Sequence, residues 1–151
     1  MIDIDIKQVK KLREDTGVGI MACKKALGDA DGEFERAKEI LEEQAAMKAK
    51  KRADREASEG VVSAYIHTDG KKGALVELNS ETDFVARSDD FRELADELAM
   101  QICAMNPEDK EALLEQAWIR DPKKTIRGLI QEYVAKAKEN VSLGRFFRIE
   151  I

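Results

Sequence analysis

The chain has 151 residues, of which 38% are charged, and its formal net charge is −5. This acidic total argues against a dedicated nucleic-acid-binding protein, which usually carries a basic patch or stripe. No apolar run approaches the ~20 residues needed to cross a bilayer, the first five residues lack the features of a secretory signal peptide, and Cys23 and Cys103 are isolated. We therefore predict a cytoplasmic protein without membrane contact, built as one domain or as a small domain with an appended module.

The first fifty residues contain three segments with apolar residues at helical spacing. Asp5 can cap the first segment, and Gly17 suits the left-handed position that ends it. The apolar positions of the three segments are Ile6, Val9 and Leu12; Ile20, Cys23, Ala26 and Leu27; and Phe34, Ala37, Ile40 and Leu41. Three short helices bury little apolar area, so we expect a small bundle that presents one face to a partner.

A highly charged segment, residues 48–58, follows Met47 and has no large apolar side chain. We interpret it as a helical or frayed linker and as a domain boundary. Its basic residues, 48–52, favour a solvated face over a phosphate contact, because no aromatic residue is interleaved to stack on bases.

The pattern then changes to strands. Residues 60–68 alternate, with Val62, Ala64 and Ile66 on one face, and a turn at 69–73 leads to a second strand at 74–79, so the two form a hairpin. The final strand, 145–151, is expected beside the hairpin. The fold class is therefore α+β, with a three-stranded antiparallel sheet packed with helices on one face.

Helical spacing returns at 89–104, where Ser88 can cap the helix. Two Pro-containing pairs, Asn106-Pro107 and Asp121-Pro122, each predict a helix that begins with Pro at its first position. The last of these helices is expected to end at Asn140.

The segment 81–87 lies between the second strand and the helix at 89–104, so Asp83 and Phe84 occupy a strand-to-helix corner. Position alone favours a structural interpretation, in which Phe84 enters the core and Asp83 caps a turn. The alternative is that this carboxylate and aromatic ring form an exposed functional pair.

Signatures of covalent chemistry are weak. His67 is the single histidine, no Cys/His set has metal-ligand spacing, and no Gly-x-x-x-x-Gly-Lys loop occurs. We therefore expect no enzyme activity, no cofactor and no bound metal.

Four stretches of the chain resemble one known family. Residues 9–27, VKKLREDTGVGIMACKKAL, closely resemble the N-terminal signature of bacterial elongation factor Ts, and residues 82–87, TDFVAR, resemble its second signature. Residues 114–122 and 145–148 also match, in the same order along the chain.

This resemblance implies a guanine-nucleotide exchange factor for GDP-bound elongation factor Tu. By resemblance, residues 1–55 form a ubiquitin-associated-like helical module plus linker, and residues 56–151 form an α+β core domain of the dimerisation type. The implied contact positions in the module are Leu12, Gly17, Gly19, Ile20 and Met21. The implied segment that displaces the partner's magnesium ion is Thr82, Asp83, Phe84 and Val85.

The chain also departs from the family pattern. The stretch 106–116 is shorter than in fuller-length members, no second sheet subdomain or coiled-coil insert is visible, and Ala137-Lys138-Glu139-Asn140 replaces the usual Leu-Gly-Glu-Asn. Phe146 and Phe147 alternate on the final strand, so one ring faces away from the helices. An exposed ring indicates a covered sheet face, and we expect a homodimer or the partner itself to cover it.

Two rival functions remain open. A ubiquitin-associated-like adaptor for another protein would leave the segment 82–87 unexplained. A ribosome- or RNA-associated protein that uses residues 48–55 would lose its binding steeply as salt rises.

Overall fold

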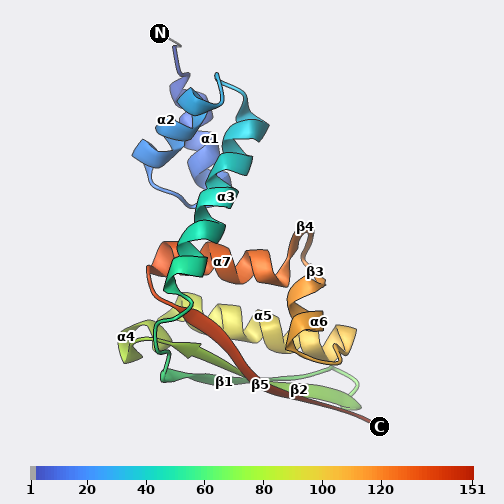
Figure 1. Ribbon diagram of the computed structural model, residues 1–151. Coiled ribbons are helices and arrows are strands. Elements are labelled where there is room, and N and C mark those ends of the chain that lie inside the picture. The colour runs from blue at the N-terminus through green and yellow to red at the C-terminus, as the bar shows by residue number, and fades with distance from the viewer. Residues whose placement is uncertain (1–2) are drawn as a thin grey trace. The chain divides into compact units, whose positions relative to one another are not determined.

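The computed structural model describes residues 3–151, so Met1 and Ile2, part of the segment inspected for a signal peptide, lie outside it. The chain divides into two compact units, Met1–Lys51 and Arg52–Ile151 (Figure 1). Helices and an antiparallel sheet are both present, which confirms the α+β class. No helix within residues 3–151 is long and apolar enough to cross a membrane.

The N-terminal unit is helical and is consistent with a ubiquitin-associated-like module. Its elements are α1 (Ile6–Thr16), α2 (Ile20–Asp29) and α3 (Phe34–Arg52). The predicted cap is confirmed, because the Asp5 carboxylate accepts a hydrogen bond from the Lys7 N–H at 2.9 Å. Gly17 ends α1 in the left-handed conformation, with φ of 68°, and its N–H donates to the Arg13 carbonyl at 2.8 Å.

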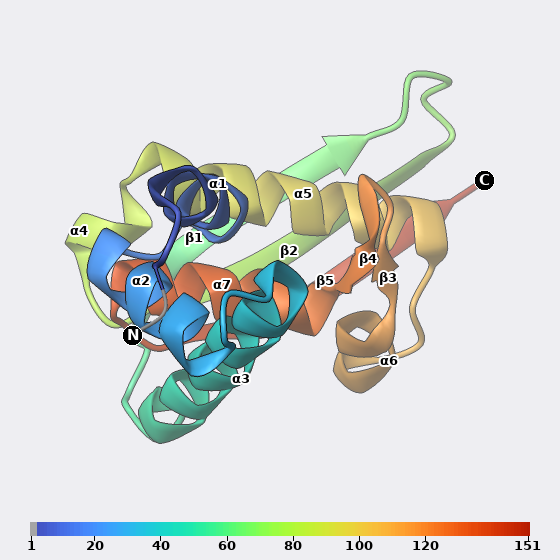
Figure 2. The ribbon, with the colours of Figure 1, turned by 90° about the horizontal axis from the view of Figure 1, so that it is seen from above.

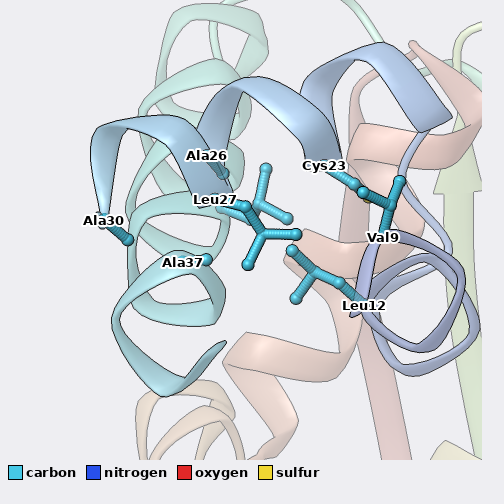
Figure 3. Packing of buried hydrophobic residues seen from close by; sticks show 8 residues of the cluster. Val9, Leu12, Cys23, Ala26, Leu27, Ala30 and Ala37 are labelled. Carbon is cyan, nitrogen blue, oxygen red and sulfur yellow. The ribbon is translucent and has the colours of Figure 1, made fainter. Parts of the chain in front are cut away.

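The core of this unit is small and consists of short side chains (Figure 3). Leu12 and Leu27 are fully buried and point toward one another. The other buried members are Val9, Cys23, Ala26, Ala30, Ala37 and Leu41. Beyond Leu41 helix α3 continues to Arg52, so the predicted linker is helical over its first five residues. The good helix formers of that stretch, with no Gly or Pro, explain the continuation.

The sheet of the second unit contains β1 (Glu59–Ile66), β2 (Lys72–Ser80) and β5 (Val141–Glu150). Both pairings are antiparallel, which confirms the predicted three-stranded antiparallel sheet, and the structure adds the order β1-β2-β5. The last strand begins four residues earlier than expected, since Val141 already pairs with Ser80. A bulge interrupts the β2–β5 pairing between Val76 and Leu78.

The helices of this unit are α4 (Asp83–Ala86), α5 (Asp89–Met105), α6 (Lys110–Glu115) and α7 (Ile126–Ala137). Helices α5 and α7 lie on the same side of the sheet, as the two views show (Figures 1 and 2). Helix α5 contacts β1 and β2, and its fully buried side chains include Phe91, Leu98 and Ile102. The face of the sheet opposite α5 has no helix of this unit on it, so the expected one-sided packing is confirmed.

Both predictions of a helix that begins at a Pro-containing pair were wrong. Asn106 instead ends α5 in a left-handed conformation, with φ of 46°, and α6 begins only after its cap Asp109. Asp121 begins strand β4 (Asp121–Thr125), which pairs with β3 (Ala117–Trp118), and Thr125 caps α7. The residue before a proline is disfavoured in the helical region, and the later Asp109 and Thr125 offer better caps.

A buried amide holds the β3–β4 hairpin against α5. Gln101 is fully buried, and its Nε2 donates to the side-chain oxygen of Gln116 at 3.2 Å and to the Ala117 carbonyl at 3.0 Å. Its Oε1 accepts a hydrogen bond from the Ile119 N–H at 3.0 Å. Both the nitrogen and the oxygen of the Gln101 side-chain amide are therefore hydrogen-bonded, as buried polar groups in proteins usually are.

Candidate functional site

The corner between β2 and α5 is built from capped, hydrogen-bonded residues. Thr82 caps the short helix α4, because its Oγ1 accepts a hydrogen bond from the Val85 N–H at 3.3 Å. The hydroxyl of Ser80 is fully buried and donates to the Thr82 carbonyl at 2.9 Å. Ser88 then caps α5, as its sequence position predicted. The corner therefore has a defined backbone.

Phe84 projects from this corner into solvent. Its side chain is 86% exposed, so the structural interpretation, which placed the ring in the core, was wrong. The reason lies in α4, where Val85 and Ala86 are buried and occupy the inward side of its single turn. A solvent-exposed aromatic ring on a rigid backbone presents apolar surface that is favourable to bury against a partner. Such rings are typical interface anchors.

Asp83 lies beside Phe84 and pairs with Arg87 one turn later, with an Nη2–Oδ2 distance of 2.8 Å. Both side chains are more than half exposed, so the pair contributes only about 0.3–0.5 kcal/mol to the helix. The Asp83 carboxylate thus stays accessible. A basic side chain of a binding partner could replace Arg87 as its ion-pair partner, and little stability would be lost.

An ion pair joins the two helices next to the corner. Lys136 of α7 contacts Asp90 of α5 with an Nζ–Oδ2 distance of 2.7 Å. The hydrogen bond that the Lys136 ammonium donates to this carboxylate raises the pKa of Lys136 above its ordinary value. The first turn of α5 is therefore tied to the end of α7.

The five predicted contact positions of the N-terminal unit differ in exposure. Gly17, Gly19, Ile20 and Met21 form an exposed loop and helix start, and the Met21 side chain is 76% exposed. Leu12 is fully buried between the helices, so its own side chain offers no contact area (Figure 3). A role for Leu12 is therefore limited to supporting the loop that follows α1.

The corner also has two partners that the sequence did not reveal. Glu139 follows α7, and its carboxylate accepts hydrogen bonds from both the N–H and the hydroxyl of Thr82, at 3.0 and 2.7 Å. The N–H of Asn140 donates to the Glu81 carboxylate at 2.6 Å. The only sequence signal for these contacts is that 137–140 aligns with a family tetrapeptide, since they join residues far apart in the chain.

Nothing in residues 3–151 resembles a metal centre. No group of three or more His, Cys, Asp or Glu side chains in that range is arranged to hold a metal ion. His67 has a different partner, because its Nδ1 lies 3.3 Å from the Tyr65 hydroxyl.

Comparison with known proteins places this geometry in a family. The model of the family described as Elongation factor TS matches residues 81–151, a range that begins at the corner itself. A protein named elongation factor Ts from Fervidobacterium nodosum is 39% identical over 195 aligned positions, which cover 99% of each chain. The protein of the same name from Coprothermobacter proteolyticus is 40% identical, and the alignment covers 97% of this chain and 98% of that protein. The one from Thermotoga maritima is 39% identical, with 99% of this chain and 97% of that protein covered.

The 195 aligned positions exceed the 151 residues of this chain, so the Fervidobacterium protein contains residues without a counterpart here. The similarity nevertheless runs from end to end and includes both compact units. The chain belongs to the elongation factor Ts family of bacterial translation elongation factors.

Proposed function

We propose that the chain is a guanine-nucleotide exchange factor for GDP-bound elongation factor Tu and that it acts in the cytoplasm. The observation that carries the proposal is Phe84, a ring that is 86% exposed at a hydrogen-bonded corner in a member of this family. The proposed action is accelerated release of GDP, in which no covalent bond is made or broken.

The wedge segment, defined as Thr82, Asp83, Phe84 and Val85, acts near the magnesium ion that the partner holds with its nucleotide. Magnesium requires nearly ideal octahedral geometry, with oxygen ligands at about 2.0–2.1 Å. A small shift of the partner's ligating loops therefore weakens the metal and with it the grip on the phosphates. Phe84 supplies the apolar anchor for that shift, and the accessible carboxylate of Asp83 supplies the charge.

Binding and nucleotide release are linked thermodynamically. If the factor weakens GDP binding by a given ratio, GDP weakens binding of the factor by the same ratio. The complex with GDP is therefore short-lived, and the nucleotide-free complex is the tightly bound state. Val85 is buried, so we assign it to holding α4 in place and leave contact with the partner to Asp83 and Phe84.

We propose a division of labour in which residues 1–55 supply affinity and residues 56–151 accelerate release. The exposed Ile20 and Met21 give the module an apolar contact surface next to the glycine loop of Gly17 and Gly19. Leu12 supports this loop from the core. The second unit carries the wedge segment.

We further propose that the uncovered sheet face packs against the same face of a second copy of the chain. Its apolar members are exposed and lie on neighbouring strands: Val62, Ile66, Leu75, Phe147 and Ile149. The charged pair on this face is internally satisfied, because hydrogen bonds from Asn79 and Arg145 lower the pKa of Glu77. Apolar rows of this kind suit sheet-on-sheet packing about 10 Å apart.

The decisive experiment measures the release of labelled GDP from elongation factor Tu with and without the full chain. We expect strong acceleration by the wild-type chain and by Met105→Ala, which removes an exposed apolar side chain outside the site. We expect little acceleration by Phe84→Ala. A wild-type chain without effect on the release rate would refute the proposal.

A salt series separates this function from RNA binding. Nucleic-acid binding through the basic residues of 48–55 would fall steeply as salt rises, because released counterions drive it. Exchange that depends on an inserted aromatic ring should change much less.

A further inference from the structure

We propose that Glu139 is a positioning residue that holds the wedge segment in its exposed geometry, with Asn140 as its support. This inference rests on the proposed exchange function, because it concerns how the wedge segment is kept ready. Neither residue touches the partner in this scheme, and both act through Glu81 and Thr82.

The first step of the argument is that α4 is too short to keep its own shape. Its four residues form a single turn, and a turn without tertiary support is unfavourable in water. Phe84, at 86% exposed, makes no packing contact that would hold the turn. The buried Val85 holds the inward side of the turn, and the contacts that fix Thr82 at its start must come from residues outside the wedge segment.

The second step is that all polar groups of Thr82 are engaged. Its N–H and hydroxyl donate to the two carboxylate oxygens of Glu139, at 3.0 and 2.7 Å. Its Oγ1 also accepts from the Val85 N–H, and its carbonyl accepts from Ser80 Oγ and from the Ala86 N–H. Hydrogen bonds to a carboxylate are about twice as strong as neutral ones, so Glu139 makes the strongest of these contacts.

The third step is that Glu81, the residue before Thr82, is held by Asn140, the residue after Glu139 in the turn that follows α7. The N–H of Asn140 donates to Glu81 Oε1 at 2.6 Å, and Arg55 forms an ion pair with the same oxygen at 3.6 Å. The nearly buried Asn140 amide also donates to the carbonyls of Ala53 and Arg55, at 3.4 and 2.7 Å. Two consecutive residues after α7, Glu139 and Asn140, thus form hydrogen bonds with two consecutive residues of the corner, Thr82 and Glu81.

The fourth step is that the backbone is bent to make this grip. Lys138 ends α7 in a left-handed conformation, with φ of 58°, which non-glycine residues rarely adopt. That bend lets the chain leave α7 with Glu139 and Asn140 both against the corner. A turn that only connected α7 to β5 would have no need of a carboxylate with two hydrogen bonds to Thr82.

The test uses the full chain with Glu139→Ala, Glu139→Gln and the control Glu132→Ala. Glu132 is a partly exposed α7 residue that pairs with Lys124 and does not contact the corner. For each variant we would measure the melting temperature, the maximal GDP release rate and the half-saturating concentration. All rates are normalised to the folded fraction.

For Glu139→Ala we expect at least a fivefold loss in normalised exchange efficiency, whereas Glu132→Ala should match the wild type. Glu139→Gln should recover much of the loss, because its amide oxygen can still accept from the Thr82 N–H. Since Glu139 acts through Phe84, the double variant Glu139→Ala/Phe84→Ala should be no slower than Phe84→Ala alone.

Three results would overturn the inference while leaving the exchange function intact. They are wild-type exchange by Glu139→Ala, a loss that disappears after normalisation to the folded fraction, or a loss that adds in full to that of Phe84→Ala. If Glu139→Ala does not fold, Glu139→Gln decides. Its neutral amide oxygen accepts a weaker hydrogen bond than the carboxylate, so hydrogen exchange at the Thr82 amide should be faster than in the wild type, and wild-type protection of this amide would overturn the inference. A wild-type chain that does not accelerate GDP release would instead refute the exchange function itself.

Discussion

Phe147 lies directly opposite Leu75 in the register of β2 and β5, and both side chains are exposed on the sheet face away from α5. Placing a charge at this point should separate two copies that pack through the face. We expect light scattering of the wild-type chain at micromolar concentration to give twice the chain mass of 17.0 kDa. Phe147→Glu should give the single-chain mass.

The matched control for this dimer is Met105→Glu, which places the same charge at another exposed apolar position. It should leave the dimer intact. A wild-type chain that is monomeric throughout the concentration range would exclude a homodimer and leave elongation factor Tu as the candidate that covers the face.

Phe84→Ala should slow GDP release at least tenfold, which corresponds to more than about 1.4 kcal/mol for a lost aromatic anchor. Its melting temperature should stay close to that of the wild type, because the exposed ring packs on nothing in the core. Asp83→Ala should impair the same step, and the two losses should not add, since the residues act as one element.

Phe91 provides the contrasting variant, because it is fully buried only seven positions away. Phe91→Ala should cost roughly 3–5 kcal/mol of unfolding free energy through the cavity it leaves. Normal exchange by Phe84→Ala together with a large loss of stability would contradict the wedge.

A fragment that begins at Arg52 should fold but bind elongation factor Tu much more weakly than the full chain. The start is set by three contacts, because Arg52 donates to the Val134 carbonyl and the Ala53 and Arg55 carbonyls accept from Asn140. Circular dichroism would show whether the fragment folds. Measuring the GDP release rate at increasing fragment concentrations would give its potency as an exchange factor. Full potency of the fragment would disprove the division of labour between the two units.

Lys138→Gly should stabilise the chain by about 1 kcal/mol. A left-handed conformation costs an L-residue roughly 1–2 kcal/mol. Glycine avoids that cost, but its unfolded chain is more flexible, so it loses more conformational entropy on folding and part of the gain is offset. Thermal unfolding measures the gain. Lys136→Gly is the control, because it lies inside the helix and should destabilise by about 1 kcal/mol. A destabilised Lys138→Gly variant would show that the Lys138 side chain contributes more than its backbone costs.

Local signals in the sequence predicted much of this fold. The caps Asp5 and Ser88, the left-handed Gly17 and the hairpin of β1 and β2 all depend on residues within a few positions of one another. The exposed Phe84 could not be settled in this way, because its direction depends on which neighbours the core accepts. The pattern offered two interpretations, and the structure selects the exposed one.

The contacts that the sequence missed at the β3–β4 hairpin and at the corner are long-range. The β3–β4 hairpin depends on Gln101, which lies 15 to 18 positions before its partners, and Glu139 lies 57 positions after Thr82. A buried glutamine or a partly exposed glutamate carries no local pattern that names its partner. Asn106-Pro107 and Asp121-Pro122 misled for a related reason, because a better cap stood three or four residues further along.

The two cysteines of the chain are distributed one to each compact unit, Cys23 in the first and Cys103 in the second, and both are buried. A buried thiol reacts with an alkylating reagent only when its surroundings open, so its labelling rate reports the free energy of that opening. The chain therefore carries a separate native probe in each unit. Mass spectrometry of the two labelled peptides can measure whether the units open independently, without any mutation or added dye.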